Sequence, residues 1–542
     1  MNNLFSVKPV AVVRNIKVKC TFDDETILDG RAFRTAVSTV KRAGLSKAVD
    51  IEHPYVYKKS IDARDRNDIL LIYSVAFPVS DISAKPSKNV DIITTGVSDD
   101  IFATSRKDEN RPVVVGFGPG GMFCALALAK AGLRPIVIER GADVDKRAEA
   151  VSKYWQEGVL NPETNVQFGE GGAGTFSDGK LLTRINDKLC HYVLSEFVNN
   201  GAPDEIMYLA KPHIGTDNLR KVVKNIRNKI ILLGGEVRFN SCLKSVRMSS
   251  DNSIRAAVLD NGDEIACSGL FLCIGHSARD TVMNLMKADV SVEPKAFSVG
   301  VRIEHLQSEI DKALYGKFVG APSLGVAQYT LSRKFGERAV YSFCMCPGGV
   351  VVASASDEGQ IVTNGMSYYA RDGKNANSAI AVSVNTSDYG NTVEGAINFQ
   401  RDIEKNAFRE AGGDGTAPVL CLGDFLDGVV KNEPKAVLPT YTGKTAVTSA
   451  DRIFPNFITE NLRRGISMFE RDIEGFSSSS AVLTFPETRT SSPVRIPRNE
   501  NYLAVGYRNL YPCGEGAGYA GGITSAAVDG LRVALAFLEN RG

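Results

Sequence analysis

The sequence lacks the features that would mark a secreted, membrane-spanning or metal-binding protein. Its first residues, MNNLFSVKPVAVVRNIK, contain neither the apolar core nor the small-residue cleavage site of a secretory signal. No apolar run reaches about 18 residues, the least that suggests a bilayer span. The ten cysteines form no CxxC pair and show no histidine spacing typical of zinc. We therefore expect a cytoplasmic protein with reduced thiols, no membrane span and no metal site.

The chain also lacks an excess of charge of either sign. Lys+Arg number 64 and Asp+Glu number 62, so no overall field favours nucleic acid or an anionic membrane. Aromatic and basic residues are not interleaved as in many nucleic-acid-binding surfaces. We expect a small-molecule substrate and no nucleic-acid partner, and the sequence does not fix the oligomeric state.

The length of 542 residues predicts more than one domain, because single cores stop growing well below this size. Residues 1–100 read as a small α+β module with strands in KPVAVVRNIKVKC (8–20) and DILLIYSVAFPV (68–79). Between these strands a helix is expected, with one face formed by Phe33, Val37 and Val40. A polar connector ends at Pro112.

The remainder predicts an α/β protein: a doubly wound, Rossmann-like FAD-binding domain interrupted by an inserted domain. Strand, glycine turn, helix and strand follow one another from residue 113, and strand, glycine turn and helix recur at the C-terminal end. We assign residues 111–284 and 501–542 to the FAD-binding domain. Residues 285–500 show scattered short strand patterns and read as a mixed α+β substrate or cap domain.

The stretch VVVGFGPGGMF contains the G-x-G-x-x-G pattern of dinucleotide-binding turns. Gly116 permits the tight turn, Gly118 lets the backbone approach a pyrophosphate, and Gly121 lets helix and strand pack closely. A helix begins near Gly120, and its free N–H groups favour phosphate. The strand PIVIE ends in Glu139, whose carboxylate can accept the ribose hydroxyls of an adenosine.

Glu139 argues against NADP, because a carboxylate repels a 2′-phosphate, although Arg140 stands beside it as a further cofactor candidate. The tail segment CGEGAGYAGGITSAAVDG (513–530) favours FAD, because the flavin ring must be held at the end of the cofactor opposite the adenosine. There Glu515 is expected at the ribityl or phosphate linker, and a helix from Gly522 and Ile523 at the flavin pyrimidine edge. An independent NAD site in this segment would need a further strand and acid beyond residue 542.

Several segments then carry a family resemblance over nearly the whole chain. They are YKKSIDARDR (57–66), FGEGGAGTFSDGKL (168–181), KPHIGTDNL (211–219), NGMSYYARDGKNANSAI (364–380), ETRTSSPVRI (487–496) and YPCGEGAGYAGGITSAAVDG (511–530). They resemble those of the bacterial FAD-dependent dehydrogenases, also described as NAD(FAD)-utilising dehydrogenases. The resemblance implies a glutathione-reductase-like FAD domain and an oxidoreductase activity. It supplies no substrate.

Further cofactor contacts are expected in the glycine loop and at two strands. The loop GEGGAGTFSDGK brings backbone close to a flat ring or phosphate, and strands end near Val237 and Gly275. The predicted contacts from these three places are Gly171, Gly172, Thr175, Ser177, Val237 and Gly275.

The sequence does not by itself identify a catalytic residue, and the candidates are His276, Lys180 and Cys346. His276 follows the strand LFLCIG and would serve as a proton donor, or merely cap the strand end. Cys344 and Cys346 in FCMCPGG would pass electrons as a dithiol, or pack as small apolar residues. Lys180 is expected near the flavin.

Arg489, Arg495 and Arg371 are the expected contacts for an anionic group of the substrate, because guanidinium groups suit carboxylate and phosphate. A salt-bridged scaffold is the alternative reading. The sequence thus predicts an FAD-dependent oxidoreductase that transfers hydride between a small substrate and flavin N5. Two alternatives remain: an NAD(P)H-driven flavin reductase, with NAD(P)H as a transient partner, and a flavin-bound RNA-binding or RNA-modifying protein.

Overall fold

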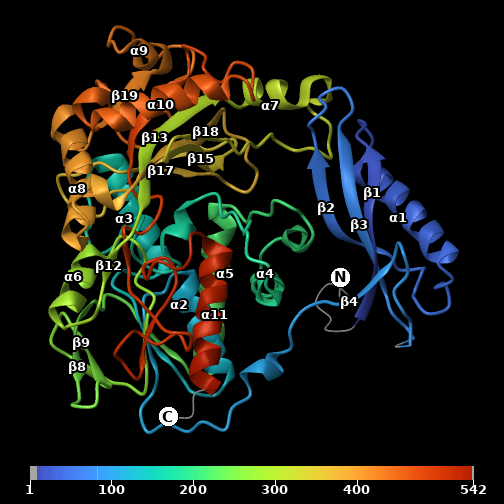
Figure 1. The fold of residues 1–542 in the computed structure, drawn as a ribbon, viewed down its shortest axis with the longest axis horizontal. Coiled ribbons are helices and arrows are strands. Elements are labelled where there is room, and N and C mark those ends of the chain that lie inside the picture. Colours follow the sequence, from blue (N-terminus) through green and yellow to red (C-terminus); the bar gives the residue numbers. More distant parts are fainter. Residues whose placement is uncertain (1–8, 82, 540–542) are drawn as a thin grey trace.

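The computed structural model describes residues 9–81 and 83–539. An antiparallel sheet of strand order β2-β3-β1-β4 forms the N-terminal module, and one helix packs on it (Figure 1). The elements are β1 (Pro9–Lys19), α1 (Glu25–Arg42), β2 (Tyr55–Asp62), β3 (Leu70–Pro78) and β4 (Asp91–Thr94). Both predicted strands are confirmed. The buried helix face is instead Leu28, Ala32, Ala36 and Val40, and Phe33 and Val37 lie at its margin.

A five-stranded parallel sheet of order β23-β11-β5-β6-β7 forms the centre of the nucleotide-binding half. Its strands are short: β5 (Val113–Val115), β6 (Ile136–Ile138), β7 (Glu236–Arg238), β11 (Leu270–Leu272) and β23 (Leu510–Pro512). The chain leaves this sheet after β11 and returns to it with β23, more than two hundred residues later. The sheet therefore confirms the α/β class.

Different layers cover the two faces of this sheet. Val114, Val137 and Phe271 point to a helical layer of α2 (Pro119–Lys130), α4 (Lys188–Asn199), α5 (Thr216–Leu232) and α11 (Ile523–Glu539). Val113, Val115 and their neighbours pack instead on an antiparallel sheet of β8 (Leu243–Met248), β9 (Ile254–Leu259) and β10 (Glu264–Ala266). The expectation of a doubly wound sheet is therefore wrong. Both layers bury apolar strand residues equally well, so the short strand sequences do not distinguish them.

The inserted cap is built on a seven-stranded sheet of order β14-β15-β18-β13-β21-β19-β20. Its strands are β13 (Phe297–Leu306), β14 (Ser332–Phe335), β15 (Arg338–Cys346), β18 (Asn375–Val384), β19 (Ala417–Cys421), β20 (Thr445–Val447) and β21 (Val482–Glu487). The helices of the cap are α7 (Gln307–Tyr315), α8 (Val393–Glu410), α9 (Leu422–Asp427) and α10 (Asn456–Phe469). The hairpin β16 (Val350–Ala353) with β17 (Thr363–Met366) completes it.

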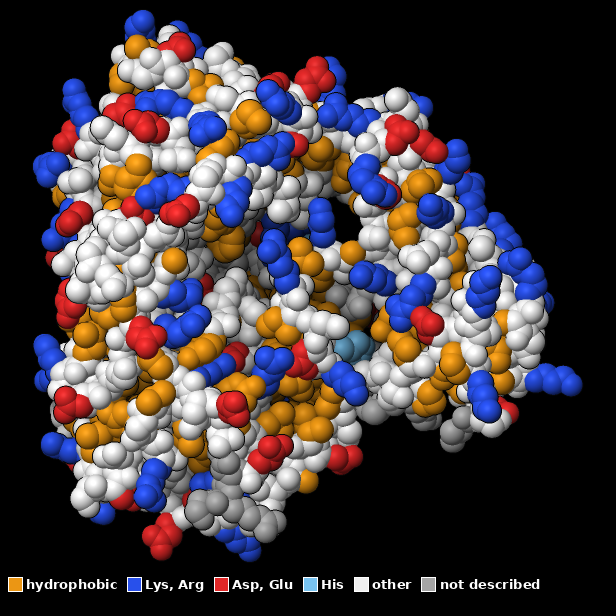
Figure 2. Space-filling model, viewed as in Figure 1, with side chains coloured by type: hydrophobic (Ala, Val, Ile, Leu, Met, Phe, Trp, Pro, Cys, Tyr) orange, Lys and Arg blue, Asp and Glu red, His pale blue; other side chains and the backbone are white. Residues whose placement is uncertain are grey.

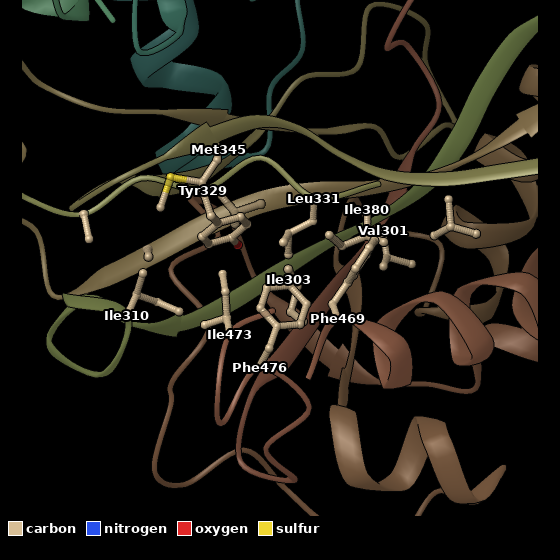
Figure 3. Close-up of a cluster of buried hydrophobic side chains, with 14 of the residues drawn as sticks. Val301, Ile303, Ile310, Tyr329, Leu331, Met345, Ile380, Phe469, Ile473 and Phe476 are labelled. Carbon is tan, nitrogen blue, oxygen red and sulfur yellow. The ribbon is translucent and has the colours of Figure 1, made fainter. Parts of the chain in front are cut away.

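The long central strands of the cap differ from the scattered short strands expected for this region. Figure 3 shows the apolar core between these strands and α10, with Val301, Ile303, Ile380 and Phe469 facing one another. Strand β13 alternates apolar Val299, Val301 and Ile303 with polar Ser298, Arg302 and Glu304, and all of these side chains are buried. Both faces of the strand are covered, so its polar side chains do not mark a solvent-facing side.

Four smaller elements link the parts. The helices α3 (Val144–Glu157) and α6 (Arg279–Lys287) follow β6 and β11, and β12 (Glu293–Pro294) pairs with β22 (Val494–Arg495) where the chain enters and leaves the cap. The N-terminal module joins the nucleotide-binding half through Lys59, whose backbone exchanges two 2.8 Å hydrogen bonds with Tyr208 and Ala210. Within the described residues, no helix combines the length and apolarity needed to cross a membrane.

Candidate functional site

The first glycine turn lies between β5 and α2, and two of its glycines have no space for side chains. A Cβ on Gly116, which has φ +94°, would lie 2.4 Å from the carbonyl oxygen of Cys273. A Cβ on Gly121 would lie 1.9 Å from the carbonyl oxygen of Gly116. Gly118 caps α2, and Pro119 occupies its first position, where the missing N–H is not needed. The N-terminus of α2 is therefore built at the place that the spacing predicts.

The glycine loop of residues 169–179 lies directly against this turn. A Cβ on Gly172 would approach the Cα of Gly118 to 2.9 Å, and the Gly171 N–H donates to the Phe117 carbonyl at 2.8 Å. Gly118, Gly172 and Gly174 remain partly exposed. Thr175, expected to line the cofactor, is buried beneath Gly171, and the Ser177 hydroxyl donates to the Gly174 carbonyl. These two side chains hold the loop in shape.

The tail segment meets the first glycine turn. A Cβ on Gly120 would contact Cys513 Sγ at 3.6 Å and the Ala526 carbonyl oxygen at 3.4 Å, and a Cβ on Gly530 would overlap the Gly120 carbonyl. Helix α11 begins at Ile523, as predicted, and Ile523 lies beside Gly174. The two glycine segments, about four hundred residues apart in the chain, thus form one surface with the loop between them.

Gly275 also belongs to this surface. It is exposed, has φ +71°, and its backbone lies where a Cβ on Gly516 would come within 2.4 Å. The N–H of Gly514 donates to Asp529 Oδ2 at 2.7 Å, which fixes the turn between β23 and α11. Sequence reasoning missed Asp529, because an acid inside an apolar helix carries no signal for a turn fifteen residues earlier.

Glu139 lies at the end of β6, where its carboxylate organises the glycine turns. Its Oε2 accepts from the Phe117 N–H at 2.8 Å, and its Oε1 accepts from the N–H groups of Gly141 and Gly169 at 3.0 and 2.9 Å. Because Oε2 has only one donor, it retains capacity for another hydrogen bond. Val237 lies on the neighbouring edge strand β7.

Arg140 is held away from this carboxylate. Its guanidinium pairs with Glu163 at 2.9 Å and with Asp280 at 2.9 Å, and it stacks over the ring of Phe168 at 4.0 Å. All of its donor nitrogens have partners, so the structure gives no support to a cofactor contact from this side chain.

A buried arginine that the sequence analysis missed supports the glycine loop. Arg147 of α3 is fully buried and donates to five backbone carbonyls between residues 165 and 172. Burial lowers its pKa to about 10. Its donors fix the path of the loop, and the helical pattern around it gives no sign of this role.

The surface fits an FAD molecule by its construction. Glycines with no room for a Cβ or with exposed backbone lie at Gly118, Gly172, Gly174 and Gly275, where a ligand would need close approach. The N-termini of α2 and α11 both open onto it, which favours negatively charged groups at two separate places. Glu139 offers the remaining acceptor. These residues would hold the two ends of an extended dinucleotide.

Three charged side chains, Glu515, Lys295 and Arg495, lie beside the turn between β23 and α11. Glu515 is partly buried, and burial raises its pKa to about 7, partly offset by the charge of Lys295. Arg495 is exposed, and its guanidinium lies 5.3 Å from the centre of the Tyr519 ring. The pKa of Lys295 is lowered, chiefly by burial and also by the charge of Arg495. Glu515 and Arg495 were expected near the cofactor and the substrate, and the structure brings them together with Lys295.

The other two predicted substrate arginines are locked into the protein. Arg489 is buried and pairs with Glu404 and Asp357, and Arg371 is buried in a two-pronged ion pair with Asp178. A substrate contact from either would require breaking a buried pair. For Arg489 and Arg371 the substrate expectation is therefore corrected to the scaffold alternative, while Arg495 stays a prediction.

The structure also shows the surroundings of the three catalytic candidates, His276, Lys180 and Cys346. Burial, with the charges of Arg489 and Arg279, lowers the pKa of His276 to about 3, which favours the neutral imidazole at pH 7, and its role as a proton donor stays a prediction. Lys180 donates its ammonium to the Met345 carbonyl of the cap. Cys346 is fully buried, and its pKa is raised well above the ordinary thiol value by the hydrogen bond to Cys344. Its neighbour Cys344 is the more accessible thiol.

Comparisons with known proteins bear on the whole chain. Residues 296–490 match the family described as "FAD-dependent protein, C-terminal domain-like". A protein of Clostridium beijerinckii, named "Uncharacterized protein", is 48% identical over 515 residues, which are 92% of this chain and 94% of the relative. The chain belongs to the family of this clostridial protein. FAD is the cofactor of this FAD-dependent protein, as the sequence predicted.

Solved structures similar to this FAD-dependent protein share little sequence with it. CtdE in complex with FAD is 13% identical with a TM-score of 0.32 and covers 79% of this chain and 84% of its own. PqsL of Pseudomonas aeruginosa, a probable FAD-dependent monooxygenase, is 12% identical with a TM-score of 0.32, covering 79% and 84%. At these levels of similarity, no reaction can be assigned to this chain from either structure. The dehydrogenase family of the first resemblance stays a prediction.

Proposed function

We propose that this FAD-dependent protein is an oxidoreductase that transfers hydride between a small substrate and flavin N5. One observation carries the proposal: the tail turn and the N-terminus of α11 lie against the first glycine turn and the loop at Gly172. The two segments have the properties needed for opposite ends of one extended cofactor. The family match to FAD-dependent proteins supports the same cofactor.

The chain's own residues would bind and orient this cofactor. The N–H groups at the start of α2 would receive the phosphates, and the Glu139 carboxylate would accept from the adenosine ribose. The positive end of α11 would stabilise negative charge at the other end of the cofactor. When bound, flavin supplies two-electron chemistry, while the protein supplies orientation and electrostatics.

The substrate of this reaction is expected to enter from the cap side. Figure 2 shows that the displayed face is hollowed between the cap and the nucleotide-binding half, beside the N-terminal end of α11 in Figure 1. Arg495 of β22 and Lys295, which directly follows β12, contribute positive charge beside Glu515. We propose that they bind an anionic group of the substrate, in place of Arg489 and Arg371.

The test begins with FAD titration of the purified protein, followed by anaerobic mixing with NADH, NADPH and a panel of small carboxylic acids. Loss of flavin absorbance with a carboxylic acid, weakened in Arg495→Gln but not in Arg333→Gln, supports the proposal. Rapid loss of colour with NADH alone supports the flavin reductase instead. Protein that binds FAD but co-purifies with RNA, in a complex that weakens steeply with salt, supports the RNA-binding alternative.

A further inference from the structure

Two cysteines of the cap lie at an irregular point of strand β15. The register of β15 with β18 shifts between Phe343 and Cys346, and Cys344 has φ +43°, a left-handed conformation that non-glycine residues rarely adopt. Met345, between them, points into the apolar core of the cap (Figure 3). Backbone strain of this kind gathers at functional sites, so the surroundings of the two thiols matter.

The two thiols are close but unequally accessible. Cys344 is partly exposed, whereas Cys346 is fully buried, and its Sγ lies 3.3 Å from the Cys344 carbonyl oxygen. Arg302 Nη1 lies 4.0 Å from Cys346 Sγ and donates to the Cys344 carbonyl at 2.9 Å. Cys344 can therefore meet a reagent from solvent, whereas Cys346, two residues further along the chain, is enclosed by protein.

The charges facing the pair favour the thiolate of Cys344. Its pKa is lowered, chiefly because the Cys346 thiol donates a hydrogen bond to it, and also by the positive charges of Arg302 and Lys180. Burial and the Asp178 carboxylate act in the opposite sense, but Asp178 is itself paired with Arg371. The same hydrogen bond raises the pKa of Cys346. Attacking and resolving roles are thus separated.

We propose that Cys344 and Cys346 form a reactive dithiol that exchanges with small-molecule disulfides. The Cys344 thiolate attacks one sulfur of the disulfide, forms a mixed disulfide and releases one thiolate. Cys346 then loses its proton to that thiolate, and its sulfur attacks Cys344 Sγ and releases the second small-molecule thiolate, which takes a proton from water. Counted from the Cys344 thiolate, the protein loses two electrons and one proton and gains a Cys344–Cys346 bond, and the small disulfide, with one further proton from water, becomes two thiols.

The dithiol is tied to the cofactor side of the molecule by the glycine loop. Lys180 donates to the Met345 carbonyl between the two cysteines, and the next residue, Leu181, accepts from the Thr524 hydroxyl at the start of α11. The proposal itself does not depend on the flavin reaction, because the exchange needs only the two thiols and the disulfide.

The first test is limited alkylation of the FAD-loaded protein with iodoacetamide at pH 7, mapped by peptide mass spectrometry. Cys344 is expected to react at least about tenfold faster than Cys190 and Cys242, the other partly exposed thiols, whose pKa values are raised by burial. Equal or faster labelling of Cys190 or Cys242 would overturn the proposal.

The second test is incubation of the wild-type protein with oxidised glutathione. A peptide linking Cys344 to Cys346, lighter by two hydrogens and restored by dithiothreitol, is the expected product. Cys346→Ser should stop at a glutathione adduct on Cys344, whereas Cys242→Ser should behave as wild type. A lasting adduct on wild-type Cys344, or no reaction there, contradicts the dithiol whether or not the variant folds.

Discussion

The nucleotide-binding half and the cap are organised by different physical means. The former is built on short parallel strands and on glycines that let backbone segments approach one another, as at Gly116, Gly121 and Gly172. The cap buries charged side chains: Glu404 of α8 forms ion pairs with Arg279 and Arg489, and Arg302 of β13 forms one with Glu487. An added methyl group at these glycines and a lost partner at these ion pairs are therefore expected to destabilise the protein for different physical reasons.

The largest effect is expected in the cap from Glu404→Gln. Burial alone would raise the pKa of Glu404, but the charges of Arg279 and Arg489 outweigh it and lower the pKa to about 2. Removing the carboxylate leaves two buried guanidiniums, so unfolding free energy should fall by about 3–5 kcal/mol. Urea unfolding at pH 7 measures the loss.

The sign of the pH dependence follows from the same pair. Because the folded pKa of Glu404 lies below the unfolded value of about 4.3, its contribution is complete above that value and declines as pH falls toward 2. The wild-type protein should lose stability over this range more steeply than Glu404→Gln. Parallel curves for the two proteins would contradict the assigned ion pair.

The nucleotide-binding half should respond most to Gly121→Ala. Its Cβ would lie 1.9 Å from a backbone oxygen that cannot move without distorting the first glycine turn, so we expect a loss of about 1–3 kcal/mol and weaker FAD binding. Gly120→Ala is the matched control, since the nearest atom to its Cβ is at 3.4 Å. Flavin fluorescence titration of both variants distinguishes them, and equal FAD affinities would argue against the assigned turn.

A smaller effect is expected from Glu515→Gln at the boundary between the halves. The pKa of Glu515 is raised to about 7, so the folded state favours its neutral form, and stability declines as pH rises from about 4.3 to 7. The glutamine variant should lack this decline and gain about 1 kcal/mol at pH 8, a modest value because the carboxyl is partly exposed. Thermal unfolding from pH 5 to pH 8 measures it.

The smallest effect is expected from Asp472→Asn on the cap surface. Its pair with Arg333 has an N–O distance of 2.6 Å, but about a third of each side chain is exposed. Solvent screens such pairs, so the change in unfolding free energy should lie within about 1 kcal/mol. A loss equal to that of Glu404→Gln would show that burial does not separate the two pairs.

The glycine spacing, the acid at the end of β6 and the start of α11 were readable from the sequence, because each is a local requirement of a turn or a helix end. The roles of Arg147 and Asp529 were not, since their backbone partners lie elsewhere in the chain. The three substrate arginines share one residue type, yet Arg489 and Arg371 are buried in ion pairs and Arg495 is exposed. Composition and spacing do not separate these outcomes.

The amino-acid sequence by itself determined the dinucleotide turn, the FAD preference and the interruption of the nucleotide-binding domain, because glycine conformations and helix termini depend on neighbouring residues. Only the tertiary structure decided which charged side chains are held in pairs, which layer covers the second face of the parallel sheet, and which thiol is accessible. Burial and charge pairing depend on segments hundreds of residues apart, and their energies appear only when those segments meet.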